Sequence, residues 1–292
     1  MLETPADRQP QQPRHSTGAW WRVLLTSLGL YVLGVVLLFL TQNPNLFPTI
    51  VLLGSFMVPG SYVAFFYERR HLSRLTMPMT ARIFVYGGLL GVFAASFLEP
   101  LFIGGFDLPS LAVVGLIEEF AKILAVMILA RGLVHNVELD GIILGAAAGM
   151  GFAALESMGY AFTEFLRSGG SLSAVVVITL VRGILSPVGH GTWTAILAGV
   201  LYRDSRPHRF RLTGAVIGAY LTVAILHSLW DGVPAVLGSF GLSGLEYLIG
   251  EGLVGAAGLA ILWWRWREAV RLEPAEMATG EEGEKPDTPA GS

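Results

Sequence analysis

The chain has 292 residues, enough for one large domain or two small ones. Apolar residues make up 53% and charged residues 14%, against about 25% charged in ordinary globular chains, and the mean hydropathy is +0.61. These values exclude a water-soluble enzyme. The absence of Cys excludes disulfides, thiolate metal sites and a cysteine nucleophile, and the net charge of −3 gives no basis for nucleic-acid binding.

Apolar segments long enough to cross a bilayer recur along the whole chain. A transmembrane helix needs about 20 apolar residues. We identify eight candidate spans, at residues 22–40, 49–67, 81–97, 110–130, 141–162, 172–202, 212–230 and 243–264. The sixth is long and contains Pro187, so we expect it to be kinked, tilted or extended beyond the lipid. The predicted fold class is all-α: a polytopic membrane protein with about eight transmembrane helices.

Basic residues predict the orientation of these spans, because Lys and Arg mark the cytoplasmic side. If the N-terminus starts inside, 16 of the 19 basic residues fall on that side and Arg167 lies in an outside loop. We therefore predict that both termini and the loop with His71 are cytoplasmic. The expected location is a lipid bilayer, as a multi-pass protein of a bacterial plasma membrane.

The two ends of the chain have the composition of disordered segments, rich in Pro and Gln or in Glu, Gly and Pro. We expect disordered cytoplasmic tails at residues 1–18 and 269–292. Between them, residues 19–268 form the eight-span membrane domain, with its polar layer in spans four to seven. The first apolar run is long enough to remain in the membrane as a signal anchor.

Ionisable residues inside the spans concentrate in these four consecutive helices. Each costs roughly 2.5–3.5 kcal/mol on insertion scales, so such residues indicate a functional role. They are Glu118, Glu119, Lys122, Glu156, Arg182, His190, His227 and Asp231. At about 1.5 Å per residue from the cytoplasmic end, Glu118 and His190 lie at about 18 Å, His227 at about 22 Å and Glu156 at about 24 Å. Two carboxylates and two imidazoles are therefore predicted to share one layer.

Residue spacing predicts which way these side chains face. A stripe of small residues in the fifth span predicts a helix–helix contact face: Gly141, Gly145 and Gly149. This stripe continues to Glu156, which should face other helices. His227 and Asp231 are four residues apart, so that the carboxylate can orient the imidazole. Glu118 precedes Lys122 by four residues, the favourable order for an ion pair.

These residue types suit peptide hydrolysis, which needs an activated water, a base and a stabiliser for the oxyanion. Two His and one or two Glu are a usual ligand set for catalytic zinc, with one open position. A remaining Glu would then serve as general base. The sequence contains no His-Glu-x-x-His, no Gly-x-Ser-x-Gly and no paired aspartates in a Gly-x-Gly-Asp setting.

The order of four short motifs resembles the PrsW family of intramembrane proteases, which belongs to a wider group with the CAAX prenyl-processing proteases. The resemblance covers about residues 108–232, and its motifs are Glu118-Glu119-x-x-Lys122, Phe152-x-x-x-Glu156, a lone His190 and His227-x-x-x-Asp231. In the CAAX relatives the first motif usually ends in Arg and the last in Asn, so Lys122 and Asp231 fit the PrsW branch better. The resemblance implies cleavage of a membrane-anchored protein, often an anti-sigma factor. Metal use is assumed for PrsW and disputed for the wider group.

We therefore predict an intramembrane peptidase in which glutamate-activated water acts with two histidines. The predicted catalytic residues are Glu118, Glu119, His190 and His227. Zinc, if used, is expected on Glu156, His190 and His227, and a metal-independent mechanism is the alternative. The predicted supporting residues are Lys122, Arg182 and Asp231.

Several other interpretations stay open. Glu118 and Lys122 can be a neutralised structural pair, and Glu119 can serve an ion pair. Arg182 can reach the outer leaflet or pair with a carboxylate, and Asp231 can be an interfacial residue. The competing functions are a proton- or ion-coupled transporter with a Glu/His relay, and a non-catalytic membrane scaffold.

Overall fold

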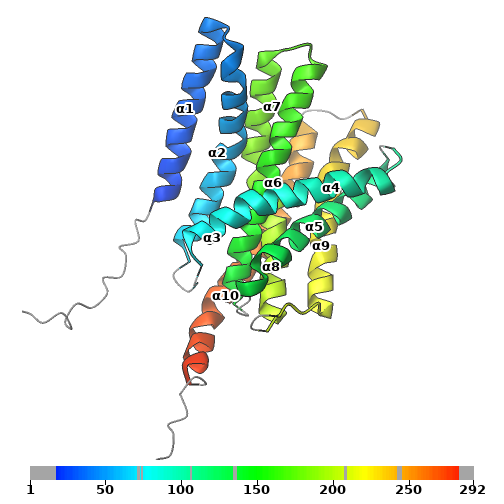
Figure 1. Ribbon diagram of the computed structural model, residues 1–292. Helices are drawn as coiled ribbons and strands as arrows, with labels where there is room; N and C mark the ends of the chain where they lie inside the picture. The colour runs from blue at the N-terminus through cyan, green and yellow to red at the C-terminus, as the bar shows by residue number, and fades with distance from the viewer. Residues whose placement is uncertain are drawn as a thin grey trace, which may run out of the picture.

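A computed structural model describes residues 18–70, 73, 75–105, 107–133, 137–206, 209–241 and 245–282. Helices contain 89% of the described residues. These residues form no strand, although Arg206 and Arg209 make an isolated β-bridge. Figure 1 shows the helices gathered into one bundle, with α1 and α2 side by side at one edge. The predicted all-α fold class is confirmed.

The helical elements follow one another with short connections. In chain order they are α1 (Ala19–Thr41), η2 (Pro44–Leu46), α2 (Phe47–Glu68), α3 (Met77–Arg82), η3 (Ile83–Gly87), α4 (Gly88–Phe102), α5 (Leu108–Ala130), η4 (Arg131–Leu133), α6 (Glu138–Arg167), α7 (Leu172–Leu185), η5 (Ser186–Val188), α8 (His190–Asp204), α9 (Gly214–Ser239) and α10 (Leu245–Glu282). In Figure 1, α4 crosses α6 at a steep angle.

Among the residues that the structure describes, six helical segments are long and apolar enough to cross a membrane. They are Ala19–Thr41, Pro44–Glu68, Met77–Phe102, Glu138–Arg167, Leu172–Asp204 and Gly214–Ser239. Helix α5 is outside this set because its middle carries Glu118, Glu119 and Lys122. The chain is a multi-pass membrane protein. The count of eight spans and the side of the termini remain predictions, and His71 lies outside the described residues.

Helix α6 packs against α8 through the small-residue stripe that the sequence predicts. A Cβ atom at Gly145 would lie 2.3 Å from the carbonyl oxygen of Thr194, and one at Gly149 would lie 2.3 Å from that of His190. No side chain fits at such a distance, so the two backbones meet only because these positions are glycine. The contact fixes the first turn of α8, where His190 lies.

The sixth predicted span is interrupted at Pro187, as expected. Helix α7 ends at Leu185, a turn of 3₁₀ helix follows, and α8 begins at His190. Proline lacks a backbone N–H and its ring clashes with the preceding turn, so an α-helix does not continue through it undisturbed. The break makes His190 the first residue of a helix that starts inside a membrane-spanning segment.

Helix α10 continues to Glu282, past the tail boundary expected at residue 269. Residues 269–282 include four Glu and three Ala, which favour helix, together with Pro274 and Gly280, which do not. Arg265 ties the helix to Glu138 of α6 and pairs with Glu268 one turn later. Residues 1–17 and 283–292 of the expected tails lie outside the described residues.

Candidate active site

Three ionisable side chains of α5 are buried against neighbouring helices. Glu118 is 6% exposed, and Glu119 and Lys122 are fully buried. The Lys122 ammonium donates to Glu118 Oε2 at 3.1 Å and to Glu119 Oε1 at 2.8 Å. Buried charges need full compensation, and one ammonium stands against two carboxylates. Further partners must therefore come from the helices packed against α5.

His227 of α9 supplies one of these partners. Its Nδ1 lies 3.0 Å from Glu119 Oε1, while its Nε2 lies 3.6 Å from Glu118 Oε2 and 3.4 Å from Asp231 Oδ2. The Thr194 hydroxyl donates to Glu119 Oε2 at 3.2 Å. Both oxygens of Glu119 are therefore engaged. A carboxylate on one imidazole nitrogen fixes the ring and directs the other nitrogen, here toward Glu118.

His190, at the start of α8, bridges α5 and α6. Its Nδ1 lies 2.8 Å from Lys122 Nζ and 3.8 Å from Glu118 Oε2, and its Nε2 lies 3.1 Å from Glu156 Oε2. The ring centroids of His190 and His227 are 5.0 Å apart. The structure thus brings together the carboxylates and imidazoles that the sequence assigns to one layer.

Arg182 of α7 pairs with Glu156 of α6. Its guanidinium donates to Glu156 Oε2 at 2.6 Å and to Ser157 Oγ at 3.3 Å, and it lies over the Tyr160 ring at 3.8 Å from the centroid. Of the two interpretations that the sequence left open for Arg182, carboxylate pairing is the one that the geometry matches. Glu156 is therefore held between a guanidinium and the His190 imidazole.

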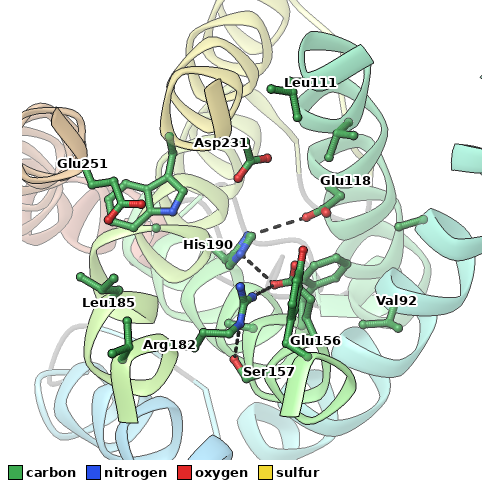
Figure 2. Close-up of a pocket in the computed structure, with 18 of the residues that line it drawn as sticks. Val92, Leu111, Glu118, Glu156, Ser157, Arg182, Leu185, His190, Asp231 and Glu251 are labelled. Carbon is green, nitrogen blue, oxygen red and sulfur yellow. Dashed lines mark hydrogen bonds and ion pairs between the residues drawn. The ribbon is translucent and has the colours of Figure 1, made fainter. Parts of the chain in front are cut away.

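A cavity of about 780 Å³ lies against this group. Figure 2 shows Glu118, Glu156, Arg182, His190 and Asp231 around it, contributed by five different helices. The remaining members of the group lie behind this wall and do not line the cavity: Glu119, Lys122 and His227. A small molecule in the cavity therefore has access to Glu118 and His190 from one side.

Other residues near the cavity gave little or no signal in the sequence. Glu99 lines the wall but lies beyond the predicted end of the third span at residue 97, whereas α4 continues to Phe102. Glu251 also lines the wall and belongs to no motif. Trp193 has its ring centroid 4.8 Å from that of His227 and 5.5 Å from that of His190. An isolated tryptophan in an apolar span gives no distinguishing pattern.

Glu118, His190 and His227 form a group that fits a metal ion. One ligand atom from each lies within 4.8 Å of the others, close enough to be reached by zinc bonds of about 2.0–2.2 Å with small adjustments. Glu156 does not belong to this group, since its carboxylate is engaged by Arg182 and by the Nε2 side of His190. This candidate group contains Glu118, whereas the sequence predicts Glu156 in the ligand set, and the ligand set remains a prediction.

Apolar helices that enclose a Glu–His–His group beside a cavity define a membrane enzyme whose site lies among its spanning helices. The sequence model of the PrsW family intramembrane metalloproteases matches residues 76–263, which include the whole group, and the chain belongs to this family. It is thus an intramembrane protease of the metalloprotease class, and the resemblance seen in the four motifs is confirmed.

The chain is also similar to the protein named Protease PrsW from Halalkalibacterium halodurans. The two are 25% identical over 215 residues, which cover 72% of this chain and 90% of that protein. No solved structure matches the chain.

Proposed function

We propose that this protease cleaves a peptide bond of a membrane-anchored protein by means of water activated at Glu118, with His190 and His227 as its partners. The observation that carries the proposal is the convergence of these three side chains within 4.8 Å beside a cavity of about 780 Å³. Peptide hydrolysis needs a proton acceptor and a group that stabilises negative charge on the scissile carbonyl oxygen. Carboxylate and imidazole supply these two functions.

Glu118 is the proton acceptor in this proposal. It lines the cavity, and its Oε2 faces Lys122, His190 and His227, whereas its Oε1 has no hydrogen-bond partner among the described residues. Glu119 does not suit this role, because it is absent from the cavity wall and both of its oxygens are engaged. We assign Glu119 to the orientation of His227.

His190 lines the cavity and is the histidine that a substrate carbonyl can reach, whereas His227 lies behind Glu118 and acts through it. Glu119 holds Nδ1 of His227 and leaves Nε2 toward Glu118, while Lys122 and Glu156 hold the two nitrogens of His190. Fixed donors beside a carbonyl oxygen stabilise its developing charge more than mobile ones, because they need no reorganisation during the reaction. Arg182 supports this arrangement by its pair with Glu156.

As the alternative to Glu118 as free base, we propose zinc as the resident metal, which Glu118, His190 and His227 would hold; Glu118 would then act as a ligand and not as the proton acceptor. Bound there, it would supply Lewis acidity toward the scissile carbonyl and acidify a water. Lys122 Nζ lies 3.1 Å from Glu118 Oε2 and 2.8 Å from His190 Nδ1, so a cation already contacts two of the three ligands. The ammonium therefore balances the charge of these side chains.

The proposed substrate is a membrane-anchored protein, with an anti-sigma factor as the class that the motifs imply. The proposed location is a bacterial plasma membrane. A cavity that is lined by Ile178, Val181 and Leu185 beside its carboxylates suits an unfolded stretch of a transmembrane segment, which brings apolar side chains and a polar backbone together.

The test is Glu118→Gln in the native cell, with new N-termini of membrane proteins measured by quantitative mass spectrometry. The matched control is Glu164→Gln, since Glu164 pairs with Arg167 and does not line the cavity. We expect the wild type and the control to generate the same cleaved peptides and Glu118→Gln to generate none. Equal cleavage by Glu118→Gln and wild type would refute the proposal.

A further inference from the structure

We infer that Tyr62 and Thr192 are positioning residues for the protease, because their hydrogen bond holds the break between α7 and α8 and so places His190. The inference rests on the proposed function of His190. Tyr62 belongs to α2, outside the residues 76–263 that the family model matches. An element beyond the matched region would thus help to set the geometry of the site.

Two linked hydrogen bonds join α2 to the break. The Thr192 hydroxyl donates to the carbonyl oxygen of Pro187 at 2.6 Å. Tyr62 Oη lies 3.2 Å from Thr192 Oγ1. Because Thr192 has one hydroxyl hydrogen and uses it on Pro187, Tyr62 must be the donor in the second bond. The chain of donors therefore runs from α2 through α8 to the 3₁₀ turn.

The broken backbone explains why these bonds matter. A carbonyl that a break leaves free within a membrane-spanning segment needs a hydrogen-bond partner, and a partner from the protein also fixes the position of the turn. Thr192 is fully buried and supplies that partner to Pro187. The amides of Thr192 and Trp193 both donate to the carbonyl of Gly189, at 3.0 and 3.1 Å. The first turn of α8 is thus closed on itself and tied back to the residue that breaks the helix.

Close packing on both sides of this turn adds to the effect. A Cβ at Gly191 would lie 2.4 Å from Met150 Sδ and 3.2 Å from Tyr62 Cε1, so the tyrosine ring lies against the α8 backbone. On the α6 side, Gly149 contacts the carbonyl of His190. The backbone of residues 190–192 is therefore packed against α6 and α2, with His190 two residues before Thr192. A displacement of about 1 Å at a catalytic group can lower the rate by about 100-fold.

A second Tyr–Thr pair in the same protein provides a matched control. Tyr31 Oη lies 3.2 Å from Thr179 Oγ1, and the Thr179 hydroxyl donates to the carbonyl of Val175 at 2.7 Å. This pair joins α1 to the middle of α7, and neither residue lines the cavity. It contains the same chemical groups at the same distance but has no broken helix to hold.

The experiment compares Thr192→Val, Thr192→Ser and Tyr62→Phe with the control variants Thr179→Val and Tyr31→Phe. Cleavage of a protein identified by the N-terminus comparison gives kcat and KM. Hydrogen exchange of the peptide that spans residues 186–195 reports the break directly, whether or not a substrate is known. Thermal unfolding of each purified variant shows that it is folded.

We expect Thr192→Val to lower kcat by about 10- to 100-fold with KM nearly unchanged, and Tyr62→Phe to lower it less. Thr192→Ser should restore kcat, and exchange at 186–195 should rise only in Thr192→Val and Tyr62→Phe. Equal kcat and exchange in the Thr192 and Thr179 variants would overturn the inference. Full activity of His190→Ala would instead overturn the proposed function, whatever the exchange data show.

Discussion

Two buried ionic groups of this protein differ in how completely their charges are satisfied. Arg265 of α10 lies beside Glu138, the first residue of α6. It donates from Nε and Nη2 to Glu138 at 2.5–2.8 Å and from Nη1 to Glu268 at 2.8 Å. In the polar layer, one Lys122 ammonium is shared between Glu118, Glu119 and His190. In the first group, a bidentate pair satisfies the Glu138 carboxylate. The second group faces a cavity, and Glu118 Oε1 has no hydrogen-bond partner among the described residues.

The comparison shows that burial of charge does not by itself identify a catalytic site. Glu138 and Arg265 are 5% and 4% exposed, about as buried as Glu118, yet neither lines the large cavity. A bidentate Arg–carboxylate pair leaves little for a substrate to bind. The polar layer differs from the Glu138–Arg265 group because its charges are incompletely paired and lie beside an accessible cavity. Variants of the polar layer should therefore lose activity, whereas variants of the Glu138–Arg265 group should lose stability.

The largest effect is expected from His190→Ala and His227→Ala. Each removes one of the three ligand atoms that lie within 4.8 Å, so purified variants should lose the stoichiometric zinc that we expect in the wild type. Cleavage should fall to the level of Glu118→Gln, because the Lewis acidity that zinc would supply toward the scissile carbonyl is lost with it. Elemental analysis and a cleavage assay measure the two losses.

A chelator-treated wild type provides the control for the role of the metal. Full cleavage in a sample shown to be metal-free would rule out zinc while leaving Glu118 as the base. If zinc stays bound in both histidine variants, the ligand assignment is wrong.

Arg265→Ala should damage stability instead of chemistry. Removal of one partner from a buried ion pair leaves an uncompensated charge and costs about 3–5 kcal/mol of unfolding free energy. We expect a much lower melting temperature, with the turnover of each folded molecule close to that of the wild type. The double variant Glu138→Leu/Arg265→Met should recover most of the stability, since it leaves no fully buried charge unpaired and Glu268, which loses Arg265, is partly exposed. A loss of turnover in the folded Arg265→Ala protein would contradict the distinction between the two groups.

Much of this comparison could be predicted from the sequence. Depth along a helix follows from counting residues, which places Glu118, Glu156, His190 and His227 in one predicted layer. Pro187 predicts a kinked, tilted or extended sixth span, and the glycine stripe predicts a helix–helix contact face without naming its partner. Helix rotation and tilt do not follow from counting. The choice between Glu118 and Glu156 as partner of both histidines depends on them.

Long-range pairs also escaped prediction, for a related reason. Glu138 and Arg265 are 127 residues apart, and neither gives a pattern that points to the other. Tyr62 is one of several hydroxyl-bearing residues in the apolar helix α2. Its role becomes visible only from its position beside the break at Pro187. Glu99 was missed because hydropathy ended the third span before the helix ended.

A smaller effect is expected from Glu119→Gln. The carboxylate holds His227 Nδ1 at 3.0 Å, and loss of such a partner of a metal-binding imidazole lowers metal affinity or activity by about 10- to 100-fold. Glutamine keeps the shape and one of the two acceptor oxygens, so the protein should stay folded although the bonds to the other oxygen are lost. Zinc affinity and kcat measure the change, and Thr194→Val, which removes only the partner of the second oxygen, should act less strongly. An unchanged affinity and kcat would make Glu119 a purely structural member of the group.

The smallest effect concerns Asp107, which caps the helix that carries Glu118. Its Oδ1 accepts the Ser110 amide at 2.8 Å, and hydrogen bonds from the Ser110 hydroxyl and amide hold the pKa of the Asp107 carboxyl below its usual value. A carboxyl with a lowered pKa stabilises the folded state above its unfolded pKa of about 3.9, and this contribution disappears as the pH falls through the folded pKa. Asp107→Ala should therefore melt below the wild type at pH 7, by an amount that shrinks on acidification below about pH 4. Asp107→Asn keeps an acceptor that does not titrate, so its advantage over Asp107→Ala should not vary with pH. The effect is small because the carboxylate is exposed to solvent, which screens its charge. A wild-type advantage over Asp107→Ala that stays constant into acid would show that the charge of the cap does not contribute to the stability of α5.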